Sequence, residues 1–87
     1  MFDNLKKIQE LKRMQDALKA ERETVEKKGV SVTVNGGMEV ERITLNSALD
    51  QEETEQVLRQ CVNEANKNIQ KRIAKMMMDS GMGGLSL

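Results

Sequence analysis

The chain has 87 residues, enough for one small domain, with 14 basic and 14 acidic side chains and a formal net charge of zero. This balance argues against a strong, general binder of polyanions, although local clusters of charge could still form a basic surface. The absence of histidine and the single cysteine exclude Ser-His-Asp and Cys-His nucleophile pairs, a thiolate zinc cluster and an internal disulfide.

A long first helix is predicted from about Asp3 to Lys28. Asp3 and Asn4 are suitable N-terminal caps, and Gly29 is placed to end the helix. Apolar residues recur mostly every three or four positions, as on one side of a helix: Phe2, Leu5, Ile8, Leu11, Met14, Leu18 and Val25. At 1.5 Å per residue the helix would be roughly 35 to 40 Å long. A short hairpin cannot cover that length, so part of the helix should project or pack on a partner chain.

A β-hairpin is predicted next, because residues 29–45 are the only part of the chain with a β pattern. Valines alternate with polar residues over 30–35, and a second alternating run follows the Asn-Gly-Gly sequence at 35–37. A three-residue loop over 35–37, with a glycine in the left-handed position, is favoured because it sets the apolar residues on one face. In that register two pairs face each other: Val34 with Met38, and Val32 with Val40.

After Val40 the apolar pattern changes phase, because the next apolar residues are Ile43 and Leu45. This odd step predicts a bulge or bend near Glu41–Arg42. A hairpin between two long helices would leave apolar surface exposed, so we expect copies of the chain to associate. The expected dimer interface is the apolar side of the hairpin: Val30, Val32, Val34, Met38, Val40, Ile43 and Leu45.

The second helix should start near Asp50 and stop before Gly81. Asp50 followed by Glu53 resembles a capping box, and the acidic first turn suits the positive end of the helix dipole. The apolar face is regular: Val57, Leu58, Cys61, Val62, Ala65, Ile69, Ile73, Met76 and Met77. Cys61 is interpreted as a small buried hydrophobe rather than a reactive thiol. The methionines at 76–78 form either an adaptable contact surface or a frayed apolar helix end.

Basic residues gather early in the first helix and late in the second. The candidates for contact with a nucleic acid are Lys6, Lys7, Lys12, Arg13, Lys71, Arg72 and Lys75. Two interpretations are open: a nucleic-acid surface, or a solvated face with favourable charge near a helix C-terminus. No aromatic residues are interleaved to stack bases, and no recognition-helix motif indicates base reading.

The sequence contains no catalytic or phosphate-loop motif, so we expect no enzyme activity, no cofactor and no metal site. It shows no signal peptide and no membrane-length apolar run, and the expected location is the cytoplasm. Residues 1–80 are expected to form a single domain of helix, hairpin and helix. Residues 81–87 are expected to form a flexible Gly/Met-rich tail.

The order of these elements resembles the YbaB/EbfC family of nucleoid-associated proteins. The resemblance rests on the charged leading helix, GVSVTVNGGMEVERITLN at 29–46, VNEANKNIQKRIAKMM at 62–77 and the closing Gly-Met-Gly-Gly at 81–84. It implies an α-β-α homodimer whose hairpins join into one sheet, with helices that project like tweezers. It also implies DNA binding with little or loose sequence preference, at the bacterial nucleoid.

We therefore expect an α+β fold of long helix, β-hairpin and long helix, with the hairpins joined into one sheet in a homodimer. The leading hypothesis is a nucleoid-associated protein that grips double-stranded DNA through phosphate contacts with low sequence specificity. The alternative is an adaptor whose helices dock a protein partner linked to recombination or replication, with incidental DNA contact. A small enzyme is a third option, and it would need a polar pocket that the sequence does not suggest.

Overall fold

The computed structural model describes residues 2–79, which form two helices and a three-stranded antiparallel sheet of order β1-β2-β3. The chain runs through α1 (Phe2–Ala20), β1 (Arg22–Lys27), β2 (Val30–Asn35), β3 (Val40–Thr44) and α2 (Gln51–Asp79). The α+β class is confirmed. The tail predicted for residues 81–87 lies outside the described residues.

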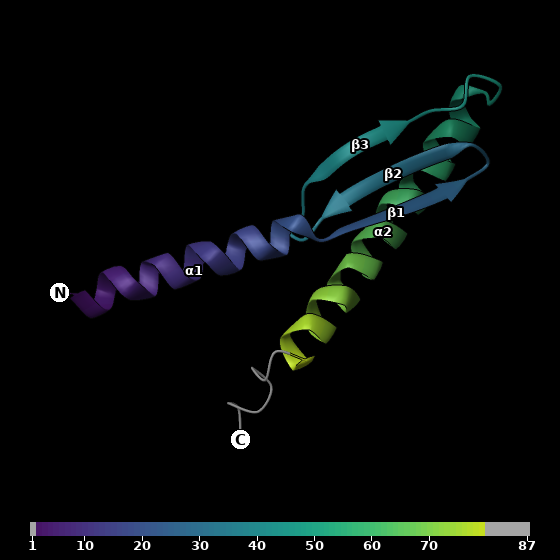
Figure 1. Cartoon of the computed structure of the whole chain (residues 1–87). Helices are drawn as coiled ribbons and strands as arrows, with labels where there is room; N and C mark the ends of the chain where they lie inside the picture. The colour runs from purple at the N-terminus through teal and green to yellow at the C-terminus, as the bar shows by residue number, and fades with distance from the viewer. Residues whose placement is uncertain (1, 80–87) are drawn as a thin grey trace.

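The first helix is shorter than predicted, because the segment after Ala20 forms strand β1 (Figure 1). Val25 fits the helical spacing, but it also alternates with polar neighbours in Arg22–Lys27, and its side chain is buried opposite Val32. Pairing along the whole of β2 satisfies the backbone groups of this segment and buries Val25, which a helix extended into solvent could not do. The prediction of a helix as far as Lys28 is therefore wrong.

Gly29 lies in a β-turn and not at a helix end. Lys28 and Gly29 both have positive φ, at 51° and 81°, and they form the two-residue connection between the paired residues Lys27 and Val30. The amide of Asn46 donates to the Lys28 carbonyl at 2.9 Å and fixes the turn from the other side. A helix cap and this hairpin turn require the same left-handed backbone, so the sequence identified the conformation but assigned it to the wrong element.

The second hairpin has a longer loop than predicted. Val34 pairs with Val40 and Val32 with Ile43, so Met38 belongs to the loop and takes the left-handed conformation with φ 63°. The predicted register is wrong, although the predicted bulge is confirmed, because Glu41 is the extra residue between these pairs.

Asn35 explains the longer loop. Its side-chain oxygen accepts from the backbone N–H groups of Gly37 at 2.8 Å and Glu39 at 3.2 Å, and its amide donates to Glu41 at 2.9 Å. The backbone N–H of Asn35 also donates to the Glu39 carbonyl at 2.9 Å. These bonds satisfy the polar groups of the turn, and they outweigh the pairing inferred from hydrophobicity alone.

The core lies between α2 and one face of β1 and β2. It consists of valines from the strands and small or branched residues from the helix: Val25, Val30, Val32, Val34, Val57, Cys61, Ala65 and Ile69. Cys61 is fully buried, as predicted, with its Sγ 3.6 Å from the Val30 carbonyl oxygen. The side chains of Val30, Val32 and Val34 are also fully buried within the chain. They have no surface left for a partner, which corrects their assignment to the dimer interface.

Helix α2 begins as predicted. The carboxylate of Asp50 accepts from the backbone N–H of Glu53 at 2.8 Å, as an N-terminal cap does. The Glu53 side chain does not complete a capping box, because it pairs with Lys28 at 2.8 Å. This ion pair ties the start of α2 to the β1–β2 turn.

Helix α1 projects away from the sheet and diverges from the second half of α2 (Figure 1). The end of α1 is anchored at the β2–β3 loop, where the N–H of Gly36 donates at 3.0 Å to the carbonyl of Glu21, the residue that follows the helix. A Cβ atom at Gly36 would lie 2.0 Å from the Leu18 carbonyl oxygen, so this close approach requires glycine. Farther along α1, the side chains of Leu5, Ile8 and Leu11 are 59%, 61% and 60% exposed.

Candidate nucleic-acid interface

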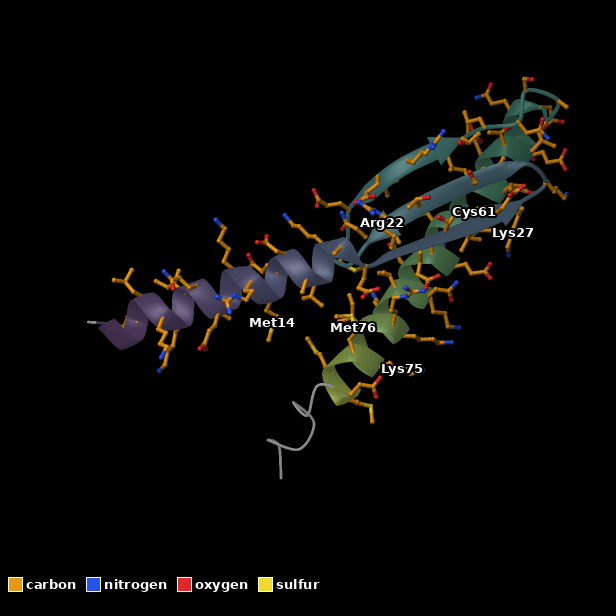
Figure 2. The ribbon with its side chains drawn as sticks, viewed as in Figure 1. Met14, Arg22, Lys27, Cys61, Lys75 and Met76 are labelled. Atoms are coloured by element: carbon orange, nitrogen blue, oxygen red, sulfur yellow. The ribbon has the colours of Figure 1, made fainter. Side chains whose placement is uncertain are left out.

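The second half of α2 carries a row of three exposed lysines, Lys67, Lys71 and Lys75. Each lysine follows a core or partly buried residue of α2 by two positions, which is about 200° around the helix, so the row lies on a side of α2 away from the core. The row is about 12 Å long at 1.5 Å per residue. Figure 2 shows Lys75 on the part of α2 that extends past the sheet.

The helix dipole does not account for this row. Dipole compensation acts within the last turn of a helix, and the last described turn of α2 has no basic residue. The start of α2 is acidic, with Glu52 and Glu53 in its first turn, so charge changes sign along the helix. The lysine row therefore forms a local cationic surface on a chain of zero net charge.

Lys71 and Lys75 also line an open hollow of about 470 Å³ beside β1, together with Arg72, Glu23 and Asn68. Among residues 2–79, neither of these two lysines has an ion pair with another side chain. Their ammonium groups are available to an anion in solution. The structure thus brings together the three basic residues predicted on the second helix.

Arg72 plays a different role from the lysines beside it. Its guanidinium lies 2.6 Å from the Glu23 carboxylate and 3.1 Å from the Glu21 carboxylate. Hydrogen bonds to Glu21 and then to Glu23 raise the pKa of Arg72 above its ordinary value. Its charge is compensated within the chain, where it fastens the junction between α1 and β1 to α2.

The predicted basic residues of the first helix lie on projecting α1, apart from the hollow. In the described part of the chain, no ion pair involves Lys6, Lys7, Lys12 or Arg13. At 100° per residue, Lys6 and Arg13 share a side of the helix, whereas Lys7 and Lys12 turn away to either side. These residues spread positive charge around α1, which we call the α1 arm, and do not form a single stripe.

Lys67 was not among the predicted contact residues. The sequence did contain its signal, because Lys67, Lys71 and Lys75 are spaced at i, i+4 and i+8 and must share one side of a helix. The structure adds that this side faces solvent. Lys67 therefore joins the candidate surface, whereas Arg72 has its charge satisfied by two glutamates.

Between residues 2 and 79, no group of three or more histidine, cysteine, aspartate or glutamate side chains could hold a metal ion. No described helix is long and apolar enough to cross a membrane.

Comparison with known proteins identifies the family. The model of the YbaB/EbfC DNA-binding family matches residues 1–85. The chain belongs to this family. No curated protein and no solved structure matches the chain. The match covers both helices and the whole sheet, so the α1 arm and the lysine row of α2 both lie inside the region that defines a YbaB/EbfC protein.

Proposed function

We propose that this YbaB/EbfC protein is a homodimeric, nucleoid-associated protein that binds double-stranded DNA through its phosphate backbone. The observation that carries the proposal is the row of exposed lysines, Lys67, Lys71 and Lys75, which faces solvent on α2. Its length of about 12 Å spans three or four phosphates of one strand, counted at 3.4 Å of duplex axis per phosphate. The basic residues of α1 provide a second set of contacts at the same end of the molecule.

Low sequence specificity follows from the kind of contacts available. Lysine ammonium groups bind phosphates as point charges and carry no information about the bases. The chain has a single aromatic residue and therefore cannot form a stacking platform for bases. Affinity without base readout suits a protein that coats DNA at the nucleoid, and this function would place it in the bacterial cytoplasm.

The proposed dimer joins two copies along their β3 edges. Val40, Ile43 and Leu45 are 46%, 47% and 56% exposed, because α2 packs mainly on β1 and β2 and leaves β3 uncovered. The β1 side, in contrast, is closed by ion pairs to α2, between Lys27 and Glu64 and between Arg72 and Glu23. An apolar edge strand is a ready site for pairing, and charged groups protect an edge from it.

Pairing of two β3 strands would give a six-stranded sheet that carries two lysine rows and two α1 arms. The remaining predicted interface residue, Met38, is half-exposed in the loop before β3 and could extend this contact. Linking two weak phosphate-binding surfaces raises the overall affinity, because the second contact becomes intramolecular. A dimer therefore compensates for the zero net charge of the single chain.

A salt series tests the proposed DNA binding. The affinity of the protein for a random-sequence duplex, measured by fluorescence anisotropy, should fall linearly on a log–log plot as salt rises. Replacing Lys67, Lys71 and Lys75 by glutamine should flatten that slope, by about one for each lost phosphate contact. A matched triple variant at Gln51, Glu52 and Glu55, changed to alanine at the far end of α2, should keep the slope. Absence of binding at low salt, or a slope unchanged by the lysine variant, would disprove the proposal.

The second candidate, an adaptor for a protein partner, is favoured by one observation: the exposed apolar residues Leu5, Ile8 and Leu11 of α1. Charge reversal distinguishes the two functions. Lys71→Glu with Lys75→Glu should abolish DNA binding and leave a contact through the apolar side of α1 intact. If this variant still binds DNA like the parent, the phosphate surface must lie elsewhere.

A further inference from the structure

The space between α1 and the end of α2 contains an apolar groove of about 310 Å³. It is lined by Met14, Ala17 and Leu18 from α1 and by Met76 and Met77 from α2. Glu10 and Arg13 are the charged residues of the lining within residues 2–79. In Figure 2 the side chains of Met14 and Met76 face the gap between the two helices. The groove thus lies where α1 and the second half of α2 diverge.

We propose that this groove binds the C-terminal segment of the same chain, residues 80–87. The segment directly follows α2, whose last described residue, Asp79, is two positions past Met77. It carries apolar residues that match the lining, at Met82, Leu85 and Leu87. Leu85 and Leu87 are two positions apart and point to the same side of an extended backbone.

The length of the segment fits this binding mode. Eight residues reach about 26 Å when extended. The part of α1 that lines the groove, from Glu10 to Leu18, is about 12 Å long at 1.5 Å per residue. The remaining length is enough for the chain to leave α2, reverse and enter. The glycines at 81, 83 and 84 supply the backbone freedom that a reversal needs.

The covalent connection favours this occupant over a second copy of the chain. A segment tethered by a short linker has a millimolar effective concentration at a neighbouring site. Separate copies at micromolar concentration would need a much larger contact to compete. Burying two or three apolar side chains is therefore sufficient for the tethered segment, and the methionine lining can adapt to leucine side chains.

The bound segment would act as a brace. It would contact α1 and α2 together and fix the angle between them farther out than the contacts at the base of α1, namely Gly36 with Glu21 and Leu18 and the ion pair of Arg72 with Glu21. Binding of the C-terminal segment in the groove does not depend on DNA. An experiment can therefore disprove either the segment binding or the DNA binding without affecting the other.

Paramagnetic relaxation in the full chain tests the proposal. A spin label is attached to Ser86→Cys in a Cys61→Ala background, and methyl signals of methionine and valine are recorded. The expected result is loss of the Met14 and Met76 signals, with the Val57 signal retained. Val57 is the control because it lies 19 positions before Met76 on α2, roughly 28 Å away. Retention of the Met14 signal would overturn the proposal.

Two further samples complete the experiment. Spin-labelled protein without isotope is mixed with isotope-labelled protein without spin label, and loss of Met14 signal in this mixture would show that a second copy supplies the segment, against the proposal. In isotope-labelled protein without a spin label, the double variant Leu85→Ser with Leu87→Ser should shift the Met14 and Met76 signals. Deletion of residues 80–87 should shift them in the same way. Ser86→Ala should leave them in place. A double variant indistinguishable from the parent would also overturn the proposal.

Discussion

Arg72 of α2 and Glu23 of β1, 49 positions apart in the sequence, form the tightest ion pair between the helix and the sheet margin. Nη2 and Nε of the guanidinium lie 2.6 and 2.7 Å from the same carboxylate oxygen, and Nη1 lies 3.1 Å from Glu21. The pair closes the β1 edge and fixes the point where α1 leaves the sheet. An arginine predicted to bind DNA is thus a positioning residue for the arm.

Neighbouring residues Arg72 and Lys71 should therefore respond in opposite ways to the same change. Arg72→Gln should lower Tm modestly, because two carboxylates lose their partner on a half-exposed surface where solvent screens the pair. The salt slope of its DNA affinity should stay close to that of the parent. Lys71→Gln should keep Tm and reduce the salt slope by about one. The reverse pattern in thermal melts and anisotropy would assign the phosphate contact to Arg72.

The sequence predicted the α+β class, the second helix with its cap, the bulge at Glu41 and the burial of Cys61. It did not reveal β1, and Val25 shows why. One apolar residue among charges fits both a helix and an edge strand, and only pairing with Val32 decides between them. Glu23 is four positions from both Lys19 and Lys27, which suits a helix, yet it binds Arg72 in the structure.

The prediction of site residues was limited in the same way, because the sequence does not show which distant segments lie side by side. The row formed by Lys67, Lys71 and Lys75 can be derived from spacing alone, because residues four apart share a side of a helix. The ion pairs that compensate the charge of Arg72 cannot be derived from spacing, because they depend on β1 lying beside α2. The same missing strand led Val30, Val32 and Val34 to be assigned to a dimer interface, whereas α2 of their own chain buries them.

Gly36 should be the least replaceable glycine among those of the β2–β3 loop. Gly36→Ala would place a methyl group 2.0 Å from the Leu18 carbonyl oxygen, so the last turn of α1 must move away from the loop. We expect a loss of about 1 to 3 kcal/mol in the free energy of unfolding, typical of overpacking. Gly37→Ala is the matched control, because its nearest contact is the Lys19 side chain at 3.0 Å, which can move. Chemical denaturation of both variants measures the difference, and equal losses would contradict the close approach at Gly36.

Acid should weaken the β2–β3 loop through Glu41. Hydrogen bonds from Asn35 and then Arg22 hold the pKa of this carboxyl below its ordinary 4.5. A lowered pKa in the folded state means that the stabilisation is complete above the unfolded-state pKa and disappears as pH falls through the folded value. The Tm difference between the parent and Glu41→Gln should therefore be present at neutral pH and vanish in acid. Glu10→Gln on α1 serves as the control. A Tm difference that stays constant with pH would exclude this role of Glu41.

A charged residue in place of exposed Ile43 should prevent dimerisation and leave the fold of the single chain intact. The Ile43 side chain is 47% exposed on β3, the strand that α2 leaves uncovered, so aspartate there should change the free energy of unfolding of the single chain little. In the proposed dimer the two introduced carboxylates would lie close together across the β3 edges, where like charges out of water oppose pairing. Ile43→Asp should therefore give the mass of one 9.8 kDa chain in light scattering at micromolar concentration, whereas the parent gives twice that mass.

The matched control for Ile43→Asp places the same charge on the other edge strand. Thr24→Asp on β1 should leave the dimer mass unchanged, because that margin is occupied by ion pairs to α2 and is not proposed to pair. Circular dichroism of both variants checks that the helices persist. If Thr24→Asp and not Ile43→Asp dissociates the dimer, the β1 edge is the interface. DNA affinity of the Ile43→Asp monomer should fall strongly, because it loses the second lysine row while its own row is intact.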